Sequence, residues 1–225
     1  MPLQSLCGEP CAPASLQLLF EAVATVAFAL SGVIEAARKR LDAVAVCVVA
    51  GLAAFGGGTL RDVLLDRRPF FWVAHAGWLW ALLAGCIAAM LFLRARHFAP
   101  TERAMAWPDA LGLGLFAAGG TQIALGAQMP AIVAVLMGTV TAAFGGVLRD
   151  IVCNEVPRAF SDHRPYAVCA FAGGWVVVAA HAAGLPPGPG LLAGAALATL
   201  ARLLALWRDW RLPAWRAHEG AGEGD

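Results

Sequence analysis

Seven long apolar runs, separated by short polar or proline-containing connections, follow one another along the chain. A transmembrane helix needs about 20 predominantly apolar residues to cross roughly 30 Å of hydrocarbon. The pattern therefore predicts an all-α integral membrane protein with seven transmembrane helices, and not a soluble enzyme. The predicted spans are Leu16–Ile34, Ala43–Leu65, Gly77–Leu93, Asp109–Leu125, Ala131–Cys153, Tyr166–Ala183 and Gly190–Leu206.

The connections contain residues that start or stop helices. Asp42 can cap the second span, and Pro130 is expected at the first position of the fifth helix, where a missing N–H costs nothing. Helix-breaking residues are expected between spans rather than within them. The prolines assigned to connections are Pro69, Pro100, Pro108, Pro157, Pro165 and Pro186–Pro189.

Composition supports the membrane interpretation. The chain is 60% hydrophobic and 14% charged, whereas soluble domains carry about a quarter charged residues. The net charge of +1 comes with no basic patch, so no nucleic-acid partner is expected. The histidines lie near helix ends or in connections, which argues against a metal cluster. The cysteines within spans are expected to be structural thiols. Cys7 and Cys11, in the N-terminal tail, can oxidise if that tail faces an oxidising compartment.

The basic residues predict an orientation. With seven spans, one side of the membrane receives Arg61, Arg67 and Arg68, and the other side receives the remaining thirteen of the sixteen Lys and Arg residues. Cationic segments stay on the cytoplasmic side. The N-terminus is therefore expected outside, and the C-terminal tail, residues 208–225, in the cytoplasm.

An internal repeat spans most of the chain. Shifted by 88 positions, the segment Phe28–Trp72 lies over Phe116–Phe160 with twelve identities, the densest being Gly-Gly-x-Leu-Arg-Asp. Three helices are an odd number, so the second copy enters the membrane from the opposite face, an architecture of transporters and some channels. The predicted units are an N-terminal tail (residues 1–15), a first repeat (16–98), an inverted second repeat (99–186) and a seventh helix (187–207).

Gly57 lies within hydrocarbon, at about 21 Å along the second span at 1.5 Å per residue. By the inverted repeat, Gly145 and Gly146 are expected nearer the cytoplasmic side. Glycines at this depth either allow a kink or an unwound turn beside a water-filled path, whose free carbonyls suit a cation, or let two helices pack closely. The pathway interpretation is preferred because the motif occurs twice. Its glycines are Gly56, Gly57, Gly58, Gly145 and Gly146.

Charged residues within spans should face protein or water and have partners. Residues adjacent in sequence do not face each other on a helix, so the motif arginines are not expected to pair with the aspartates that follow them, Asp62 and Asp150. Depth in the membrane instead predicts two repeat-related pairs, Glu21–Arg61 and Asp109–Arg149, although solvation of both acids near helix ends is an open alternative. Hydroxyl groups that can line a wet path or join helices belong to Ser31, Thr59, Thr139 and Thr141.

The segments Phe28-Ala-Leu-Ser-Gly32, Phe55-Gly-Gly-Gly-Thr-Leu-Arg-Asp62 and Phe144-Gly-Gly-Val-Leu-Arg-Asp150 resemble the prokaryotic trimeric intracellular cation (TRIC) channels. The resemblance implies a homotrimer in a bacterial inner membrane. Each protomer would have its own pore for monovalent cations, chiefly potassium, flanked by glycine-kinked second and fifth helices. It implies no cofactor beyond the permeant ion, and leaves a bound lipid open.

Two departures qualify the resemblance. Phe144 replaces Gly56 in the second motif, which stiffens or partly plugs that kink, and the Lys-Glu-Val motif of animal members is absent. Bacterial sequences with this domain have also been labelled glycine transporters. A carrier for a small amino acid is therefore the alternative function.

Overall fold

The computed structural model describes residues 14–96 and 101–213, and Cys7 and Cys11 lie outside them. Every regular element within these ranges is a helix. Their order along the chain is α1 (Ala14–Arg38), α2 (Ala43–Leu64), α3 (Phe71–Ala74), α4 (Gly77–Arg96), α5 (Glu102–Gly126), α6 (Ala131–Val152), α7 (Arg158–Ser161), α8 (Ala167–Ala182) and α9 (Pro187–Trp207).

The long helices follow the predicted spans, with two corrections at prolines. Pro108 lies inside α5, which begins at Glu102 because Thr101 caps it: the Thr101 hydroxyl accepts a hydrogen bond from the Ala104 amide at 3.1 Å. Pro187 and Pro189 lie in the first turn of α9 rather than in a connection. The first turn tolerates proline because its amides have no partner within the helix. The four-residue helices α3 and α7 were not predicted.

Four helices of the described residues are long and apolar enough to cross a membrane: α1, α2, α6 and α9. The apolar stretches of α4 and α8 are shorter. The helix α5 lies inside the bundle. It packs against α1, α6, α8 and α9 and buries most of its residues. A helix enclosed by other helices does not meet lipid, so it can carry polar residues that a lipid-facing helix cannot.

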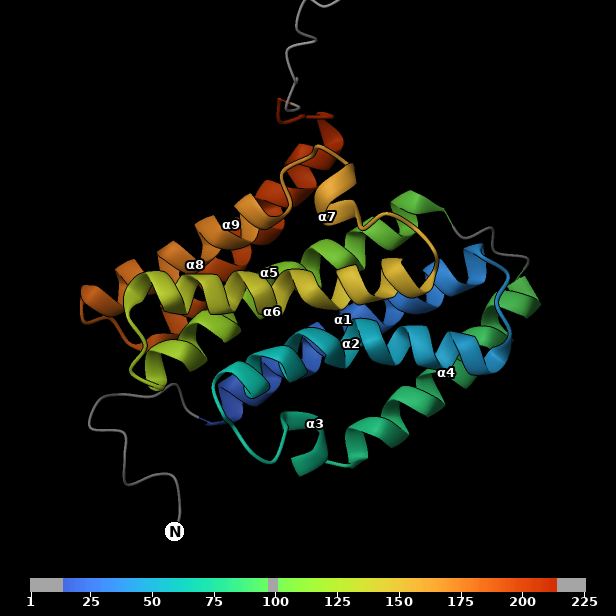
Figure 1. Cartoon of the computed structure of the whole chain (residues 1–225), viewed down its shortest axis with the longest axis horizontal. Helices are drawn as coiled ribbons and strands as arrows, with labels where there is room; N and C mark the ends of the chain where they lie inside the picture. The colour runs from blue at the N-terminus through green and yellow to red at the C-terminus, as the bar shows by residue number, and fades with distance from the viewer. Residues whose placement is uncertain (1–13, 97–100, 214–225) are drawn as a thin grey trace, which may run out of the picture.

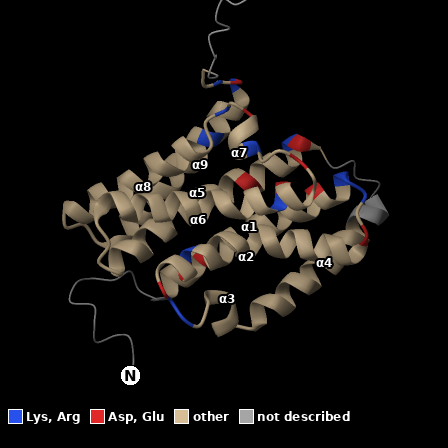
Figure 2. Cartoon of the chain, in the orientation of Figure 1, with Lys and Arg blue, Asp and Glu red and all other residues tan. Residues whose placement is uncertain are grey.

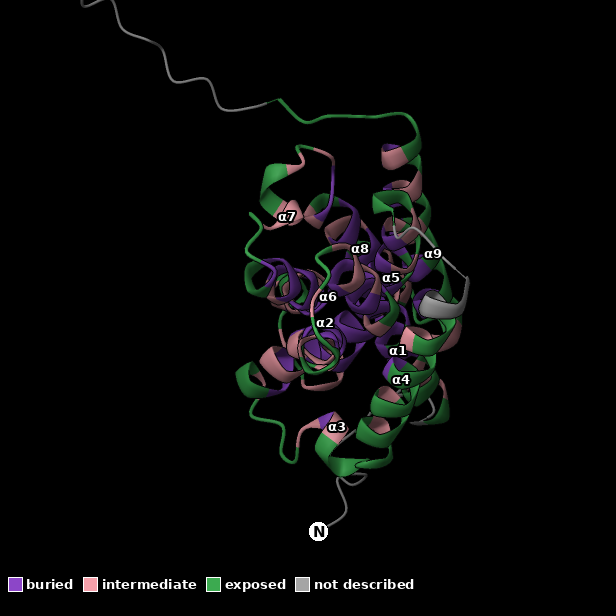
Figure 3. Cartoon of the chain, turned by 90° about the vertical axis from the view of Figure 1, so that its right-hand side faces the viewer, coloured by how far each residue is buried: buried purple, intermediate pink, exposed green. Residues whose placement is uncertain are grey.

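The core consists of small residues and a few aromatic rings. The rings of Phe28 in α1 and Phe116 in α5 stack with centroids 5.6 Å apart, and these two residues are related by the 88-residue repeat. Figure 3 shows buried residues concentrated in α1, α2, α5 and α6, whereas α4 is largely exposed. The helices lie side by side in one layered bundle (Figure 1).

Charged residues gather at the helix ends (Figure 2). One group lies where α2 approaches α3, and a larger group surrounds α7 and the neighbouring ends of α1 and α5. The middle of the bundle is almost uncharged. The buried charged residues that reach inward from these ends are Glu21, Glu35, Arg61, Asp62, Asp109, Arg149, Asp150 and Arg202.

Candidate functional site

The two glycine motifs bring α2 and α6 into contact. A Cβ atom added to Gly57 would lie 1.9 Å from the carbonyl oxygen of Thr141, and one added to Gly145 would lie 2.2 Å from that of Ala53. The repeat relates Gly57 to Gly145 and Ala53 to Thr141. The two contacts are therefore the same contact with the repeats exchanged.

A second pair of contacts is related by the repeat in the same way, one between α1 and α2 and the other between α5 and α6. A Cβ atom at Gly32 would lie 2.8 Å from the Cα atom of Ala50, and one at Gly120 would lie 3.0 Å from that of Gly138. The backbones approach so closely that only glycine fits at these positions. Close packing is thus what these glycines do in this structure.

The predicted unwound turn is absent from the described residues. The helix α2 continues through Gly56–Gly58, and α6 continues through Gly145 and Gly146. Carbonyl groups in an unbroken helix accept bonds from amides four residues later. The unbroken helices therefore contradict an unwound turn in this conformation, and the kink at these glycines stays a prediction.

The first motif site comprises Glu21, Arg61 and Asp62, each at most 8% exposed. Arg61 donates two hydrogen bonds to Asp62 Oδ1, from Nε at 2.9 Å and from Nη2 at 2.7 Å. Its Nη1 lies 2.9 Å from Glu21 Oε1, an ion pair that lacks hydrogen-bond geometry. The other oxygen of Asp62 accepts the Phe71 amide at 3.0 Å, where α3 begins.

The second motif site comprises Asp109, Arg149 and Asp150, each at most 4% exposed. Arg149 Nη1 donates to Asp109 Oδ1 at 2.6 Å and to the Ser31 hydroxyl at 2.7 Å, and Nε donates to Asp150 Oδ1 at 2.9 Å. Asp150 Oδ2 accepts the Arg158 amide at 2.9 Å, where α7 begins. Both predicted ion pairs are present in the structure.

The expectation that neighbouring Arg and Asp would not pair is wrong at both sites. Their Cα–Cβ bonds diverge on the helix, but the arginine side chain is long enough to turn back onto the next carboxylate. Each aspartate also lies at the last turn of its helix, so its second oxygen is free to hold the first amide of the following short helix.

The four predicted hydroxyl residues occupy different environments. Ser31 and Thr141 are fully buried, whereas Thr59 and Thr139 are partly exposed. All three threonines donate to the carbonyl four residues earlier in their own helix, at 2.6 to 2.9 Å. Of the four, Ser31 alone joins a motif site through a described hydrogen bond, because it accepts from Arg149.

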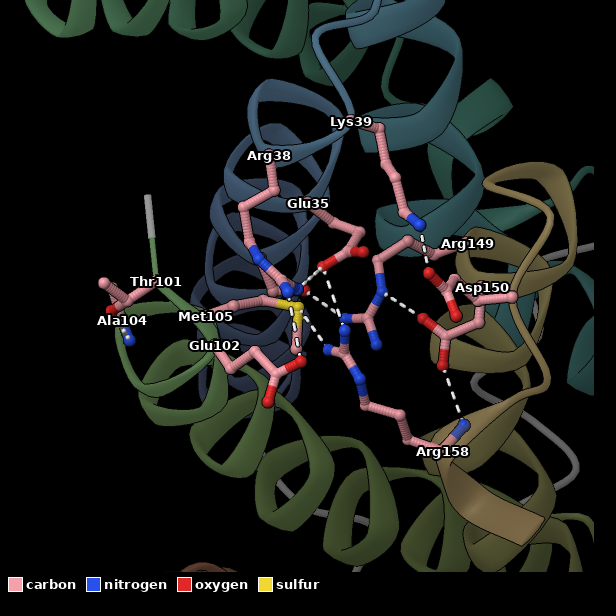
Figure 4. A network of polar contacts seen from close by, with 12 residues as sticks. Glu35, Arg38, Lys39, Thr101, Glu102, Ala104, Met105, Arg149, Asp150 and Arg158 are labelled. Atoms are coloured by element: carbon pink, nitrogen blue, oxygen red, sulfur yellow. Dashed lines mark hydrogen bonds and ion pairs between the residues drawn. The ribbon is translucent and has the colours of Figure 1, made fainter. Parts of the chain in front are cut away.

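A charged network beside α7 was not predicted. Glu35, 1% exposed, pairs through Oε2 with Arg38 Nη1 at 2.7 Å and with Arg158 Nη2 at 3.1 Å (Figure 4). Nearby, Lys39 forms an exposed ion pair with Glu155. That hydrogen bond raises the pKa of Lys39 and lowers the pKa of the Glu155 carboxyl. The available signal was a glutamate at the end of an apolar run, three residues before an arginine.

Arg202 was also missed as a buried cation. It is 4% exposed, donates to the Pro165 carbonyl at 3.1 Å, and lies over the Tyr166 ring at 4.8 Å from its centroid. It helps to line a cavity of about 820 Å³ between α5, α7 and α9, which Asp109 also lines. The second motif site therefore borders open space.

Comparisons with known proteins agree with this architecture. A family model described as "Glycine transporter" matches the chain twice, over residues 18–94 and 106–182. The "UPF0126 membrane protein" of Vibrio cholerae is 34% identical over 92% of this chain and 85% of that protein. The "UPF0126 inner membrane protein YadS" of Escherichia coli is 31% identical over 88% of this chain and 95% of that protein.

Solved structures match over nearly their whole length. The TRIC trimeric intracellular cation channel orthologue from Rhodobacter sphaeroides superposes with a TM-score of 0.81 at 33% identity, covering 87% of this chain and 99% of that chain. A second structure, described as a basis for conductance through TRIC cation channels, has a TM-score of 0.78 at 30% identity and covers 90% of this chain and 98% of that chain.

The helical bundle and its relatives define an α-helical membrane protein. The chain belongs to the family of that twice-matching model, which is the prokaryotic TRIC channel family expected from the sequence.

Proposed function

We propose that this protein is a homotrimeric channel for monovalent cations, permeable to potassium, with one ion path per protomer between its two repeats. The observation that carries the proposal is the crossing of α2 and α6. There the two Gly-Gly-x-Leu-Arg-Asp motifs meet, with a buried arginine–carboxylate site on each. Likeness to TRIC channel structures over 87% and 90% of the chain supports the same function.

The proposed architecture has seven membrane spans, α1, α2, α4, α5, α6, α8 and α9, as two inverted three-helix repeats plus a seventh helix. Contacts that exchange partners under the 88-residue shift support a twofold relation. Two matches to one family model support the repeat boundaries at residues 16–98 and 99–186, followed by the helix within 187–207. The basic residues favour the N-terminus outside and α7 on the cytoplasmic side.

The contact between α2 and α6 bears on how the proposed ion path opens and on how it distinguishes potassium from sodium. With α2 and α6 in backbone contact, conduction requires these helices to separate at Gly56–Gly58 and Gly145–Gly146. The path would then offer hydroxyls such as those of Ser31, Thr59, Thr139 and Thr141 rather than a rigid ring of carbonyls. Such a path discriminates weakly between potassium and sodium, because close selection needs many fixed oxygen ligands.

The alternative is a carrier for a small amino acid, a function named in the description of the matching family as a glycine transporter. Inverted repeats support alternating access as readily as a pore. The two functions differ in the flux that they produce, since a channel passes many ions during each opening.

Purified protein in planar bilayers with potassium chloride separates them. We expect discrete single-channel steps whose reversal potential follows the potassium gradient, with sodium passing at a similar rate. Saturable uptake of glycine into vesicles, without unitary currents, would contradict the proposal. Mass measurement of the protein in detergent checks the trimer.

A further inference from the structure

The end of the molecule near α7 contains four charged residues joined by ion pairs: Glu35, Arg38, Glu102 and Arg158, hereafter the α1–α7 clamp. Glu35 pairs with both arginines, and Arg38 Nη2 reaches Glu102 Oε1 at 3.0 Å. The clamp thus connects the end of α1 to the start of α5 and to α7 (Figure 4). These elements come from different repeats.

Glu35 is buried, so the α1–α7 clamp differs from an ion pair on the protein surface. The carboxylate is 1% exposed, whereas the two arginine side chains are 22% and 23% exposed. Its Oε2 accepts both pairs, and its Oε1 has no hydrogen-bond partner among the described residues. Removing a charge from water is unfavourable, and loss of a partner leaves a buried carboxylate without compensation. Its position therefore depends on the two arginines.

The four clamp residues are not part of the internal repeat. Under the 88-residue shift, Glu35 corresponds to Ile123 and Arg158 to Phe70. Arg38 and Glu102 correspond to Gly126 and Ala14. At the opposite end, Asp62 holds the start of α3 as Asp150 holds the start of α7, and it does so without any of the four charges. The clamp is an addition to one end of an otherwise repeated structure.

Arg158 connects the clamp directly to the second motif site. Its backbone amide donates to Asp150 Oδ2 at 2.9 Å, and its side chain donates to Glu35 Oε2 at 3.1 Å and to Met105 Sδ at 2.7 Å. One residue therefore contacts α1, α5 and α6. A shift of α6 away from α2 at Gly145 would move Asp150 and pull Arg158 away from Glu35.

We propose that Glu35 is a positioning residue that holds the α7 end of the ion path closed by fastening α1 of the first repeat to α5 and α7 of the second. This inference rests on the proposed channel function. Opening then requires the pair between Glu35 and Arg158 to break, and the end near α3, which has no counterpart of this pair, opens without that requirement.

The test uses single-channel recording of Glu35→Gln, which keeps the shape of the side chain and removes its charge. We expect the ratio of open to closed time to rise at least about fivefold, within the usual range of coupling between sites. The unitary conductance should remain unchanged, because Glu35 acts through Arg158 rather than on the ion. Arg158→Gln should act in the same direction, and Arg158→Lys should restore part of the closure.

Lys39→Gln is the matched control. It removes an ion pair at the same end of the molecule, between the chain after α1 and Glu155 before α7, but both partners are exposed. It should leave the open-to-closed ratio within twofold of the wild type. Equal gating in Glu35→Gln and Lys39→Gln would overturn the proposal. If Glu35→Gln does not fold, Arg158→Gln, whose side chain is 22% exposed, decides on the same criterion.

Hydrogen exchange separates this inference from the channel function. The amides of residues 158–161 should exchange at least about fivefold faster in Glu35→Gln than in the wild type or in Lys39→Gln. Unchanged exchange in all three proteins would refute the fastening of α7 to α1. A wild-type protein that carries no potassium current would instead refute the proposed function, whatever the exchange rates.

Discussion

The two motif sites share an Arg-Asp pair but differ in the hydrogen bonds that their arginines make. At the second site, Arg149 Nη1 donates to both Asp109 and Ser31. At the first site, Arg61 Nη1 lies beside Glu21 but donates no hydrogen bond to a described residue. The residue that the repeat relates to Ser31 is Gly119, which has no hydroxyl. The difference between the sites therefore comes from outside the motif.

One part of each motif site is therefore shared between the repeats, and another part is not. The Arg-Asp pair and its short helix are the same at both sites, since Asp62 holds the start of α3 as Asp150 holds the start of α7. The partners around each arginine are not. A duplicated motif thus supplies the frame, and single residues elsewhere make one site more tightly connected than the other.

Loss of the central arginine should have the largest effect. Arg149→Gln leaves Asp109 and Asp150 buried without their cation, and breaking a buried pair in this way costs about 3–5 kcal/mol. Arg61→Gln should cost less, because its contact with Glu21 has no hydrogen bond to lose. Unfolding of both variants in mixed detergent micelles measures the difference. A larger loss for Arg61→Gln would contradict the ranking of the sites.

Substitution of the crossing glycines should have the next largest effect, and an equal one in the two repeats. Gly57→Ala and Gly145→Ala each place a methyl group against a backbone oxygen that cannot move alone, at a cost of about 3 kcal/mol. The control is Gly119→Ala, because a Cβ atom there meets nothing within 4 Å. The same unfolding assay applies, and unequal losses for Gly57 and Gly145 would show that the crossing is not twofold.

The sequence predicted the positions of the long helices and the two motif ion pairs better than the burial of α5 or the partners of Glu35. The spacing of Glu21 and Arg61 along two helices sufficed to predict an ion pair, since depth in a membrane follows from residue count. Burial of α5 could not be predicted, because Pro108 and polar residues made its first turns look like a connection. Glu35 was missed for a related reason: it has no repeat counterpart, and its partner Arg158 follows it by 123 positions. Pairing of that kind depends on the tertiary fold.

Removal of the Ser31 hydroxyl tests the source of the difference more finely. Ser31→Ala takes one hydrogen-bond acceptor from Arg149 and leaves the arginine paired with Asp109 and Asp150. A hydrogen bond to a charged group contributes about 1.5 kcal/mol or more. We expect a loss of about 1.5 kcal/mol on unfolding. The loss should shrink markedly in the Arg149→Gln background, and an unchanged loss there would rule out the hydroxyl as the cause.

Adding a hydroxyl at the first motif site is the opposite change, and it should have the smallest effect on stability. Gly119→Ser adds a hydroxyl at the position equivalent to Ser31. A Cβ atom there meets nothing within 4 Å, so the hydroxyl has room but must extend from that Cβ to reach Arg61 Nη1, which has no hydrogen-bond partner among the described residues. Gly119→Ala supplies the control, because both substitutions remove glycine from a helix and alanine is the better helix former by about 0.5 kcal/mol. If the repeats are equivalent, the serine variant should nevertheless be more stable than the alanine variant by about 0.5–1 kcal/mol. A serine variant less stable than alanine would mean that the hydroxyl does not reach Arg61, and that the two sites differ in backbone position as well as in side chains.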